Sequence, residues 1–292
     1  MKKQCLENRA RGRNGSGRPM RKKAFIVLPL LALFVFLLAA GCGRRHVELQ
    51  PLQPPVILGI FGGMGPEATA NMYQLIVQLT PAKKDQEHIP TLIYSFPQVP
   101  DRTTAIQSGD PSIVPYLVEG VTRLRNAGAS FIIIPCNTAH FYYDRMQAAV
   151  DIPILHMIRE TVRYVAEHHP QSRHIGLLAT SGTIRSGLYE KEFAASGRQT
   201  IVPDESIETG YVMKAIMNIK AGTTKKESED LLAAAGAHLE AKGAEVLVLG
   251  CTEIPLAFNP ARATVPVVNA TRVLAEAAIR TFQVMSRNKK KR

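Results

Sequence analysis

Two cysteines occupy matching positions in the chain, in a setting that suits acid/base chemistry. The segment Gly128-Ala-Ser-Phe-Ile-Ile-Ile-Pro-Cys136-Asn-Thr corresponds to Gly243-Ala-Glu-Val-Leu-Val-Leu-Gly-Cys251-Thr-Glu, with a glycine eight residues before each cysteine. Each cysteine therefore follows a predicted buried strand, at the edge of a parallel sheet where ligands bind. Two thiols facing each other can remove a proton from one face of a carbon and deliver another to the opposite face.

Cysteine suits both roles because thiol and thiolate interconvert near neutral pH. We expect backbone amides and the positive end of the following helix to lower the thiol pKa from its usual value of about 8.5. N–H donors in a site that excludes water can stabilise a carbanion next to a carboxylate, so this chemistry needs no cofactor. The alternative is that both cysteines are small buried hydrophobic residues, which is the common role of a free cysteine.

An earlier pair of segments also matches. Residues 57–65 (ILGIFGGMG) and 175–182 (IGLLATSG) are both predicted strands that run into turns of small residues. Gly59 lies 77 residues before Cys136, and Gly176 lies 75 residues before Cys251. Two matching pairs in register indicate a duplication. We therefore predict two halves related by an approximate two-fold axis, with the cysteines facing each other across a cleft.

The elements around these segments alternate between short apolar runs and longer amphipathic ones, which is typical of parallel sheets wound with helices. The predicted fold class is α/β, with two similar pseudo-symmetric domains (56–170 and 171–286), each a mainly parallel four-stranded sheet flanked by helices. The predicted strands are 56–61, 91–96, 131–135, 154–157, 174–179, 200–203, 246–249 and 265–268. The predicted helices are 67–79, 113–127, 139–150, 160–168, 182–195, 206–219, 225–242 and 271–285.

The positive charge of the chain is concentrated at its two ends. The net charge is +12, but residues 1–45 carry +10 and the basic tail 287–292 carries +5, which leaves −3 for residues 46–286. A folded part with a net negative charge does not favour nucleic-acid binding, so we expect no nucleic-acid partner. The eight histidines show no metal-ligand spacing, and we expect no metal site.

Residues 1–42 resemble an N-terminal extension followed by a bacterial lipoprotein signal peptide. Met20-Arg-Lys-Lys precedes an uncharged run from Ala24 to Ala40, and Leu38-Ala-Ala-Gly-Cys42 resembles a lipobox in which Cys42 is lipidated. This predicts anchoring to the membrane of the cell envelope, with residues 43–55 as a linker. An uncleaved anchor remains the rival outcome, and a cytoplasmic location is the alternative to both.

Four motifs resemble the aspartate/glutamate racemase family. They are GGMGPEAT at 62–69, PCNTAH at 135–140, ATSGTIRSGLYEKEF at 179–193 and GCTEIPL at 250–256, and the resemblance extends from about residue 56 to 285. It implies two α/β domains, Cys136 and Cys251 as catalytic residues, an amino-acid substrate, no cofactor and a homodimer. Glutamate racemases usually have histidine where this chain has Glu253, which favours the aspartate-type or broad-specificity branch.

The resemblance also implies a set of substrate-binding residues. Arg102 matches an arginine that contacts a substrate carboxylate, although a solvated loop arginine is the alternative. Asn137, Thr138 and Thr252 are expected to hold the α-carboxylate, although helix capping also explains them. Lys220 matches a lysine near the substrate, and a cation is also expected at a helix end. The remaining expected substrate-binding residues are Met64, Ala139, Thr180 and Glu253.

Three functions are compatible with these observations. The first is racemisation of aspartate or glutamate by the two cysteines. The second is a related isomerisation or decarboxylation, whose enzymes generally differ at one of the two cysteine positions. The third is a lipid-anchored protein that binds an amino acid or a dicarboxylate without turnover. Turnover of a single enantiomer separates the first from the third.

Overall fold

Two parallel sheets form the framework of the computed structural model, which describes residues 55–223 and 225–290. Residues 54–292 form one compact unit. The first sheet has the order β2-β1-β3 and the second the order β5-β4-β6-β7, with all pairs parallel. The strands are β1 (Leu58–Gly62), β2 (Thr91–Ser95), β3 (Phe131–Ile133), β4 (His174–Leu178), β5 (Gln199–Ile201), β6 (Val246–Leu249) and β7 (Val267–Asn269). The predicted α/β fold class is confirmed.

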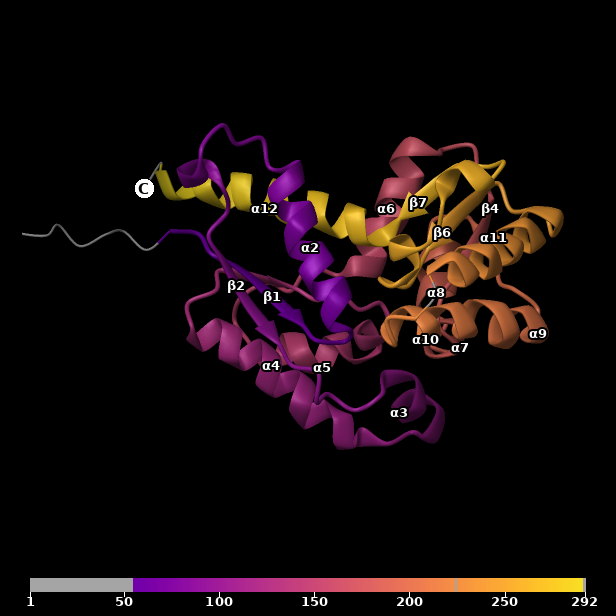
Figure 1. Ribbon diagram of the computed structural model, residues 1–292. Helices are drawn as coiled ribbons and strands as arrows, with labels where there is room; N and C mark the ends of the chain where they lie inside the picture. The colour runs from indigo at the N-terminus through magenta and orange to yellow at the C-terminus, as the bar shows by residue number, and fades with distance from the viewer. Residues whose placement is uncertain (1–54, 224, 291–292) are drawn as a thin grey trace, which may run out of the picture. The chain divides into compact units, whose positions relative to one another are not determined.

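We call the parts built on these sheets the first and the second lobe (Figure 1). The prediction of four strands in each sheet is wrong for the first lobe. The predicted strand 154–157 is reduced to a single parallel bridge between Ile132 and Ile154. The reason is local: Pro153 comes directly before the bridge, and the chain turns into a helix at Met157, with His156 as its N-cap. The bridge nevertheless occupies the place beside β3 that β7 occupies beside β6, so both lobes have the same strand order.

The helices follow the predicted ranges, with breaks in three of them. The range 139–150 divides into a 3₁₀ turn at 138–142 and a short helix, and 182–195 is divided before Gly187, whose φ is +64°. The range 206–219 contains a π-helical segment, Glu208–Met213. The sequence did not predict the helix at 102–108. The α-helices are α2 (Pro66–Leu79), α3 (Arg102–Ser108), α4 (Val114–Asn126), α5 (Tyr143–Ala148), α6 (Met157–His168), α7 (Ser181–Arg185), α8 (Leu188–Ala195), α9 (Glu205–Ile207), α10 (Lys214–Lys220), α11 (Lys225–Ala241) and α12 (Ala270–Lys290).

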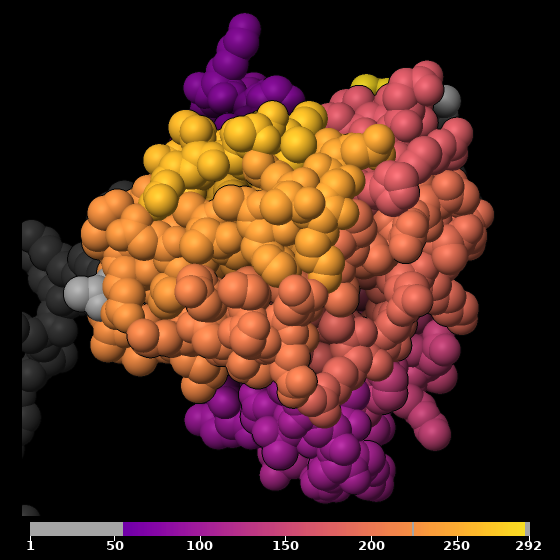
Figure 2. All heavy atoms as spheres, turned by 90° about the vertical axis from the view of Figure 1, so that its right-hand side faces the viewer, coloured from indigo at the N-terminus to yellow at the C-terminus, as the bar shows by residue number. Residues whose placement is uncertain are grey.

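Apolar side chains on both faces of each sheet bury it between helices, as the continuous apolar runs of parallel strands require. In the first lobe, α4 packs on one face and α2 and α12 pack on the other. In the second lobe, α10 and α11 cover one face and α6 and α8 the other. Viewed from the side of the second lobe, its orange and yellow atoms face the viewer, and indigo atoms of the first lobe extend beyond them above and below (Figure 2).

Two helices cross over: each packs against the sheet of the lobe opposite to the one whose strands come before it in the sequence. α6 follows the strands of the first lobe, yet Ile158, Val162 and Val165 pack against the core of the second sheet. α12 follows β7 of the second lobe, yet Leu274 and Ile279 pack against the first sheet. Residues 54–292 form one compact unit, and the predicted domain boundaries at residues 170 and 286 remain predictions.

Within residues 55–223 and 225–290, no helix combines the length and the apolar character that crossing a bilayer requires. The predicted signal segment, the lipidation site Cys42 and most of the linker 43–55 lie outside the described residues.

Candidate active site

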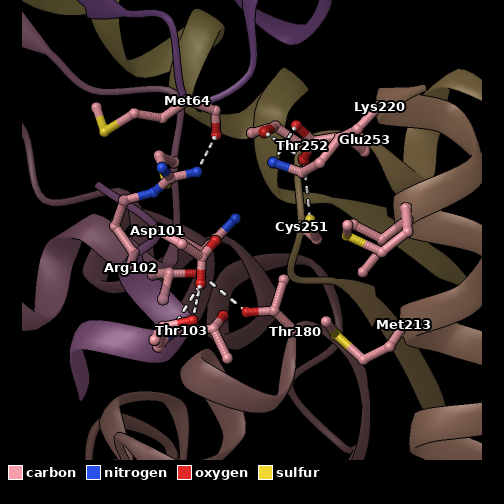
Figure 3. Close-up of a pocket in the computed structure, with 16 residues that line it drawn as sticks. Met64, Asp101, Arg102, Thr103, Thr180, Met213, Lys220, Cys251, Thr252 and Glu253 are labelled. Carbon is pink, nitrogen blue, oxygen red and sulfur yellow. Dashed lines mark hydrogen bonds and ion pairs between the residues drawn. The ribbon is translucent and has the colours of Figure 1, made fainter. Parts of the chain in front are cut away.

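A cavity of about 410 Å³ lies where the two lobes meet, and both Cys136 and Cys251 line it. Figure 3 shows Cys251 on the side of this cavity that also holds Glu253 and Lys220. Its walls come from the turns that follow β1, β3, β4 and β6, together with α3 and the segment 213–220. The carboxyl ends of parallel strands therefore meet at this cavity, as expected for an α/β ligand site. The lining residues that the sequence predicted are Met64, Arg102, Cys136, Asn137, Thr138, Thr180, Lys220, Cys251, Thr252 and Glu253.

One predicted substrate-binding residue does not line the cavity. Ala139 is fully buried, and its side chain packs in the apolar core of the first lobe. It lies in the 3₁₀ turn Thr138–Tyr142, which buries Ala139 together with His140 and Tyr142. Cys42 lies outside the described residues, so its lipidation remains a prediction.

The carboxylate of Glu253 is the centre of the Cys251 side of the cavity. Cys251 Sγ donates a hydrogen bond to Glu253 Oε2 at 3.0 Å, and the Thr252 hydroxyl lies 3.2 Å from the same oxygen. The other oxygen, Oε1, accepts from the backbone N–H of Gly65 at 3.1 Å and forms an ion pair with Lys220 at 3.3 Å. A carboxylate that is only 3% exposed needs such partners, and here each oxygen has two.

Burial and the negative charge of Glu253 raise the pKa of the Cys251 thiol well above its usual range. The expectation that the following helix lowers this pKa is therefore wrong for Cys251. A single 3₁₀ turn, Ile254–Leu256, follows the cysteine, so a long helix dipole does not point at the sulfur. The thiol is held in its protonated form and donates to the carboxylate.

The Cys136 side has neutral partners instead. The backbone carbonyl of Cys136 lies 2.9 Å from Nδ1 of the buried His140, whose Nε2 accepts from the N–H of Met157 at 3.1 Å. Because Nε2 is an acceptor, Nδ1 carries the proton and donates to the carbonyl. Burial lowers the pKa of His140, which keeps the ring neutral. The imidazole therefore fixes the backbone of the cysteine turn to the start of α6.

Hydroxyl and amide groups of the Cys136 turn bind the second lobe. Thr138 Oγ1 lies 2.9 Å from the hydroxyls of both Thr180 and Thr183, and these two lie 3.0 Å apart. The Tyr189 hydroxyl donates to Asn137 Oδ1 at 2.8 Å. This bond orients the Asn137 amide, whose Nδ2 is buried without a protein partner. A fixed N–H₂ group on the cavity wall is a ready donor for an anionic ligand.

Arg102 lies at the start of α3 and lines the cavity. Its Nη1 donates to the carbonyls of Val99 and Pro100, and its Nη2 donates to the carbonyl of Met64 at 3.3 Å. Its Nε is buried without a protein partner. One Nη2 proton and the Nε proton therefore remain, and these two form the side of the guanidinium that binds a carboxylate in two-point fashion.

The four turns form reciprocal contacts between the lobes. Glu253, in the second turn of the second lobe, accepts from Gly65 in the first turn of the first lobe. Thr138, in the second turn of the first lobe, contacts Thr180 in the first turn of the second lobe. The same turns are joined in both directions, which supports the predicted two-fold relation of the halves. Gly65 makes room for the contact with Glu253, since a Cβ there would lie 3.0 Å from Oε1 of that residue.

Several lining residues were not predicted as part of the site. Met213, Ile216 and Met217 share a helical face with Lys220, and this i, i+3, i+4, i+7 spacing was visible in the sequence. Asp101 accepts from Thr104 N–H as the N-cap of α3. Burial alone would raise the pKa of Asp101, but these hydrogen bonds and nearby cations hold it below its usual value. The other lining residues are Thr103 and Thr104.

No group of three or more His, Cys, Asp or Glu side chains in residues 55–223 and 225–290 is arranged to hold a metal ion. The groups at the cavity wall are instead thiols, N–H donors, hydroxyls and two ion-paired or tethered cations. This set can bind a carboxylate and move a proton.

Comparison with known proteins places this chain in the class of amino-acid racemases, which are isomerases. The chain belongs to the Asp/Glu/hydantoin racemase family, whose model matches residues 61–278. The predicted family is thus confirmed.

Individual relatives agree with this placement. The chain is 26% identical to the broad specificity amino-acid racemase RacX of Bacillus subtilis (strain 168) over 230 residues, which are 77% of this chain and 98% of that protein. It resembles the structure of Picrophilus torridus aspartate racemase at 29% identity and a TM-score of 0.70, over 78% of this chain and 94% of that one. An aspartate racemase homologue from Pyrococcus horikoshii OT3 shares the fold, with 23% identity and a TM-score of 0.62 over 78% of this chain and 99% of that one.

Proposed function

We propose that this protein interconverts L- and D-aspartate, with glutamate as the second candidate substrate, by a two-base reaction of Cys136 and Cys251. The observation that carries the proposal is that both cysteines line one cavity, on turns from opposite sheets. The relatives named as an aspartate racemase and as a broad specificity racemase support the same substrate class.

The reaction moves one proton off the substrate and one proton onto it. A thiolate on one side takes the proton from Cα, and the electron pair of the C–H bond passes into the adjacent carboxylate. A thiol on the other side then gives its proton to the opposite face of Cα. Because the Cys251 thiol donates to Glu253 and keeps its proton, we assign it as the acid of the free enzyme and Cys136 as the base. One turnover exchanges the two roles.

The α-carboxylate gains negative charge as Cα loses its proton, so its donors are the groups that speed the reaction. Asn137 Nδ2 has no protein partner and is held in place by Tyr189 through Oδ1. Thr138 and Thr252 offer hydroxyls on either side of the same cavity. We assign these three residues to the α-carboxylate, with Asn137 as the principal donor.

The side-chain carboxylate of aspartate needs a cation, and two cations line the cavity. Arg102 retains the N–H pair that suits two-point binding, while its other donors are fixed on backbone carbonyls. Lys220 is paired with Glu253 and is only partly exposed. We assign Arg102 to the side-chain carboxylate and Lys220 to balancing Glu253 next to the substrate.

Two further expectations are also proposals. We propose that the protein is a homodimer, which follows from the resemblance to the family and is tested by sedimentation analysis. We also propose that it is anchored to the bacterial cell envelope through lipidated Cys42, a proposal supported by the sequence of residues 20–42. Mass spectrometry of the N-terminal peptide from membranes tests it, because an unmodified Met1 or Met20 start would contradict cleavage and lipidation.

The decisive test of function uses purified residues 54–292 and single enantiomers. Incubation with L-aspartate or D-aspartate, followed by chiral chromatography, should give both enantiomers in equal amounts from either starting compound. The same assay with glutamate ranks the two candidate substrates. The double variant Cys136→Ala/Cys251→Ala serves as the control and should give no turnover. Tight binding of aspartate without any racemisation by the unsubstituted protein would contradict the proposal.

A further inference from the structure

A second cavity, of about 340 Å³, lies against the cavity of the cysteines. The two cavities share four lining residues, Asp101, Arg102, Lys220 and Glu253. Neither cysteine is among the residues that line the second cavity. Its wall includes three exposed residues, Pro66, Glu67 and Pro97. Glu253 and Lys220 therefore face both the cavity of the cysteines and a second cavity that is in contact with solvent.

Three ionisable groups form a row from Cys251 toward this second cavity (Figure 3). Cys251 Sγ donates to Glu253 Oε2 at 3.0 Å, and Glu253 Oε1 lies 3.3 Å from Lys220 Nζ. The exposed fraction of the side chain rises from 4% for Glu253 to 29% for Lys220. Each contact joins a group that can give a proton to a group that can take one, and the outer end of the row reaches solvent.

The two-base reaction creates a need for such a row. When Cys251 has given its proton to Cα, and Cys136 holds the proton that it removed, the two thiols have exchanged roles. The next molecule of the same enantiomer can react only after one proton has left Cys136 and another has reached Cys251. A thiolate at Cys251 would face the carboxylate of Glu253 at hydrogen-bond distance, and repulsion between the two anions favours the return of a proton.

We propose that Lys220 and Glu253 carry a proton from the second cavity to Cys251 and so return the enzyme to its starting state. The Lys220 ammonium gives a proton to Oε1 of Glu253, the carboxyl group turns this proton toward Cys251, and the thiolate takes it. Lys220 regains a proton from solvent in the second cavity, and Cys136 releases one to solvent in the first. One proton enters and one leaves, so the net charge of the enzyme is unchanged.

The surroundings of the two thiols agree with this direction of proton flow. Burial and the charge of Glu253 raise the pKa of Cys251, which makes its thiolate the final acceptor of the proton. The imidazole behind Cys136 bonds to the backbone carbonyl and not to the sulfur, so it offers that thiol no comparable row. Cys136 lines the first cavity and exchanges its proton there. The inference rests on the proposed two-base function, and Lys220 and Glu253 act in it through Cys251.

A tracer experiment measures the return step separately from the reaction at Cα. Labelled aspartate at equilibrium, half L and half D, is mixed with the enzyme and a saturating excess of unlabelled L-aspartate. If the return is slow, conversion of the unlabelled L-aspartate leaves the enzyme in the form that reacts with D-aspartate. Label then moves from D to L before it becomes equal again. With the unsubstituted protein we expect the label to stay equally divided throughout.

Two variants that interrupt the row should shift the label toward L-aspartate. Glu253→Gln replaces the carboxylate with an amide, which does not pass on a proton near neutral pH. Lys220→Arg keeps a cation beside Glu253, but a guanidinium does not release its proton. The control Lys214→Arg makes the same exchange on the same helix, at an exposed lysine that is paired with Glu227, and should leave the label equally divided.

The readout is the distribution of label and not the rate, so the amount of each variant is raised until the unlabelled aspartate reaches equilibrium. Damage to the fold alone would slow the reaction and leave the label equally divided. Equally divided label with either variant of the row, or a shift with the unsubstituted protein or with Lys214→Arg, would overturn the relay. If Glu253→Gln shows no turnover, Lys220→Arg decides alone. Failure of the unsubstituted protein to racemise aspartate would instead contradict the proposed function.

Discussion

The two cysteine turns occupy equivalent places in the two lobes, but their surroundings differ in chemistry. Cys251 donates to a buried carboxylate, and Lys220 balances that carboxylate from the second lobe. The turn of Cys136 is held by a neutral imidazole at its carbonyl and by hydroxyls from the other lobe. A shared backbone thus sets the positions of the two sulfurs, while the side chains around them set where the proton rests.

The same comparison extends to the whole fold. The strand order is repeated, the reciprocal contacts of Thr138 and Glu253 join the same turns, and α6 and α12 each cross to the opposite lobe. These features are matched because they determine where the backbone lies. The charges are not matched: a carboxylate and an ammonium group lie beside Cys251, whereas the imidazole behind Cys136 is neutral.

Replacing either sulfur atom is expected to have the largest effect on the racemase activity. Cys136→Ser and Cys251→Ser should each lower kcat by a factor of about 10² to 10⁴, because a serine hydroxyl is too weak an acid to ionise near neutral pH and so cannot replace the thiolate as the base. Chiral chromatography from each enantiomer measures the loss, and circular dichroism confirms the fold. If one of the two variants retains most of its racemase activity, the two-base assignment is contradicted.

The cations on the two walls should also differ in role. Arg102→Lys removes the two-point donor pair and should lower kcat/KM for aspartate by about 10- to 100-fold. The kcat/KM of the same variant for a neutral amino acid should fall by a smaller factor, since that substrate has no side-chain carboxylate. The surface change Arg185→Lys is the matched control. Equal losses for both substrates would show that Arg102 does not recognise the side chain.

The histidines on the Cys136 side predict a pH dependence of stability. Burial and the neighbouring His140 and Arg159 lower the pKa of His156 to about 3. The unfolded pKa is about 6.5, so the stabilisation is present above that pH and is lost as the pH falls toward 3. Lowering the pH from 7.5 to 5 should reduce the free energy of unfolding by about 2 kcal/mol from His156 alone.

The variant His156→Asn isolates this contribution, because asparagine also caps α6 and does not titrate. Urea unfolding at both pH values should show a smaller difference for the variant than for the unsubstituted protein. If the free energy of unfolding depends on pH identically in the two proteins, His156 does not contribute to that dependence.

A smaller effect should separate the two thiols directly. Glu253→Gln removes the negative charge beside Cys251, so the pKa of that thiol should fall and its alkylation by iodoacetamide at pH 8 should speed up by about tenfold. Peptide mass spectrometry follows both cysteines in one sample, and the alkylation rate of Cys136 should not change. A slower reaction of Cys251 in the variant would contradict the role given to Glu253.

The sequence predicted the features that repeat. A glycine, an apolar strand and a cysteine recur in both halves, so the two sheets and both thiols were predicted from spacing, whereas Arg102 and Lys220 were predicted from the family resemblance. The wall of the cavity formed by Met213, Ile216 and Met217 was missed because an apolar helical face does not by itself show whether it packs in a core or lines a cavity. The hydrogen bond from Tyr189 to Asn137 was missed because the two residues are 52 positions apart in the sequence.

Other features depend on tertiary contacts that spacing does not encode. The raised pKa of Cys251 follows from burial and from the orientation of the Glu253 side chain, whereas the sequence suggested only a helix end. The crossing of α6 and α12 depends on which sheet face is left open, and both faces attract the same apolar pattern. The lost fourth strand of the first sheet was decided by Pro153 and the early start of α6.

The central claim is that the two sulfurs act on opposite faces of one carbon, and a single isotope experiment tests it. Racemisation of L-aspartate is started in deuterium oxide and stopped early, and both enantiomers are analysed by mass spectrometry. The account predicts that the D-aspartate formed carries deuterium at Cα while the remaining L-aspartate keeps its protium. Equal deuterium in both enantiomers at the earliest times, or D-aspartate that retains protium, would show that one base serves both faces.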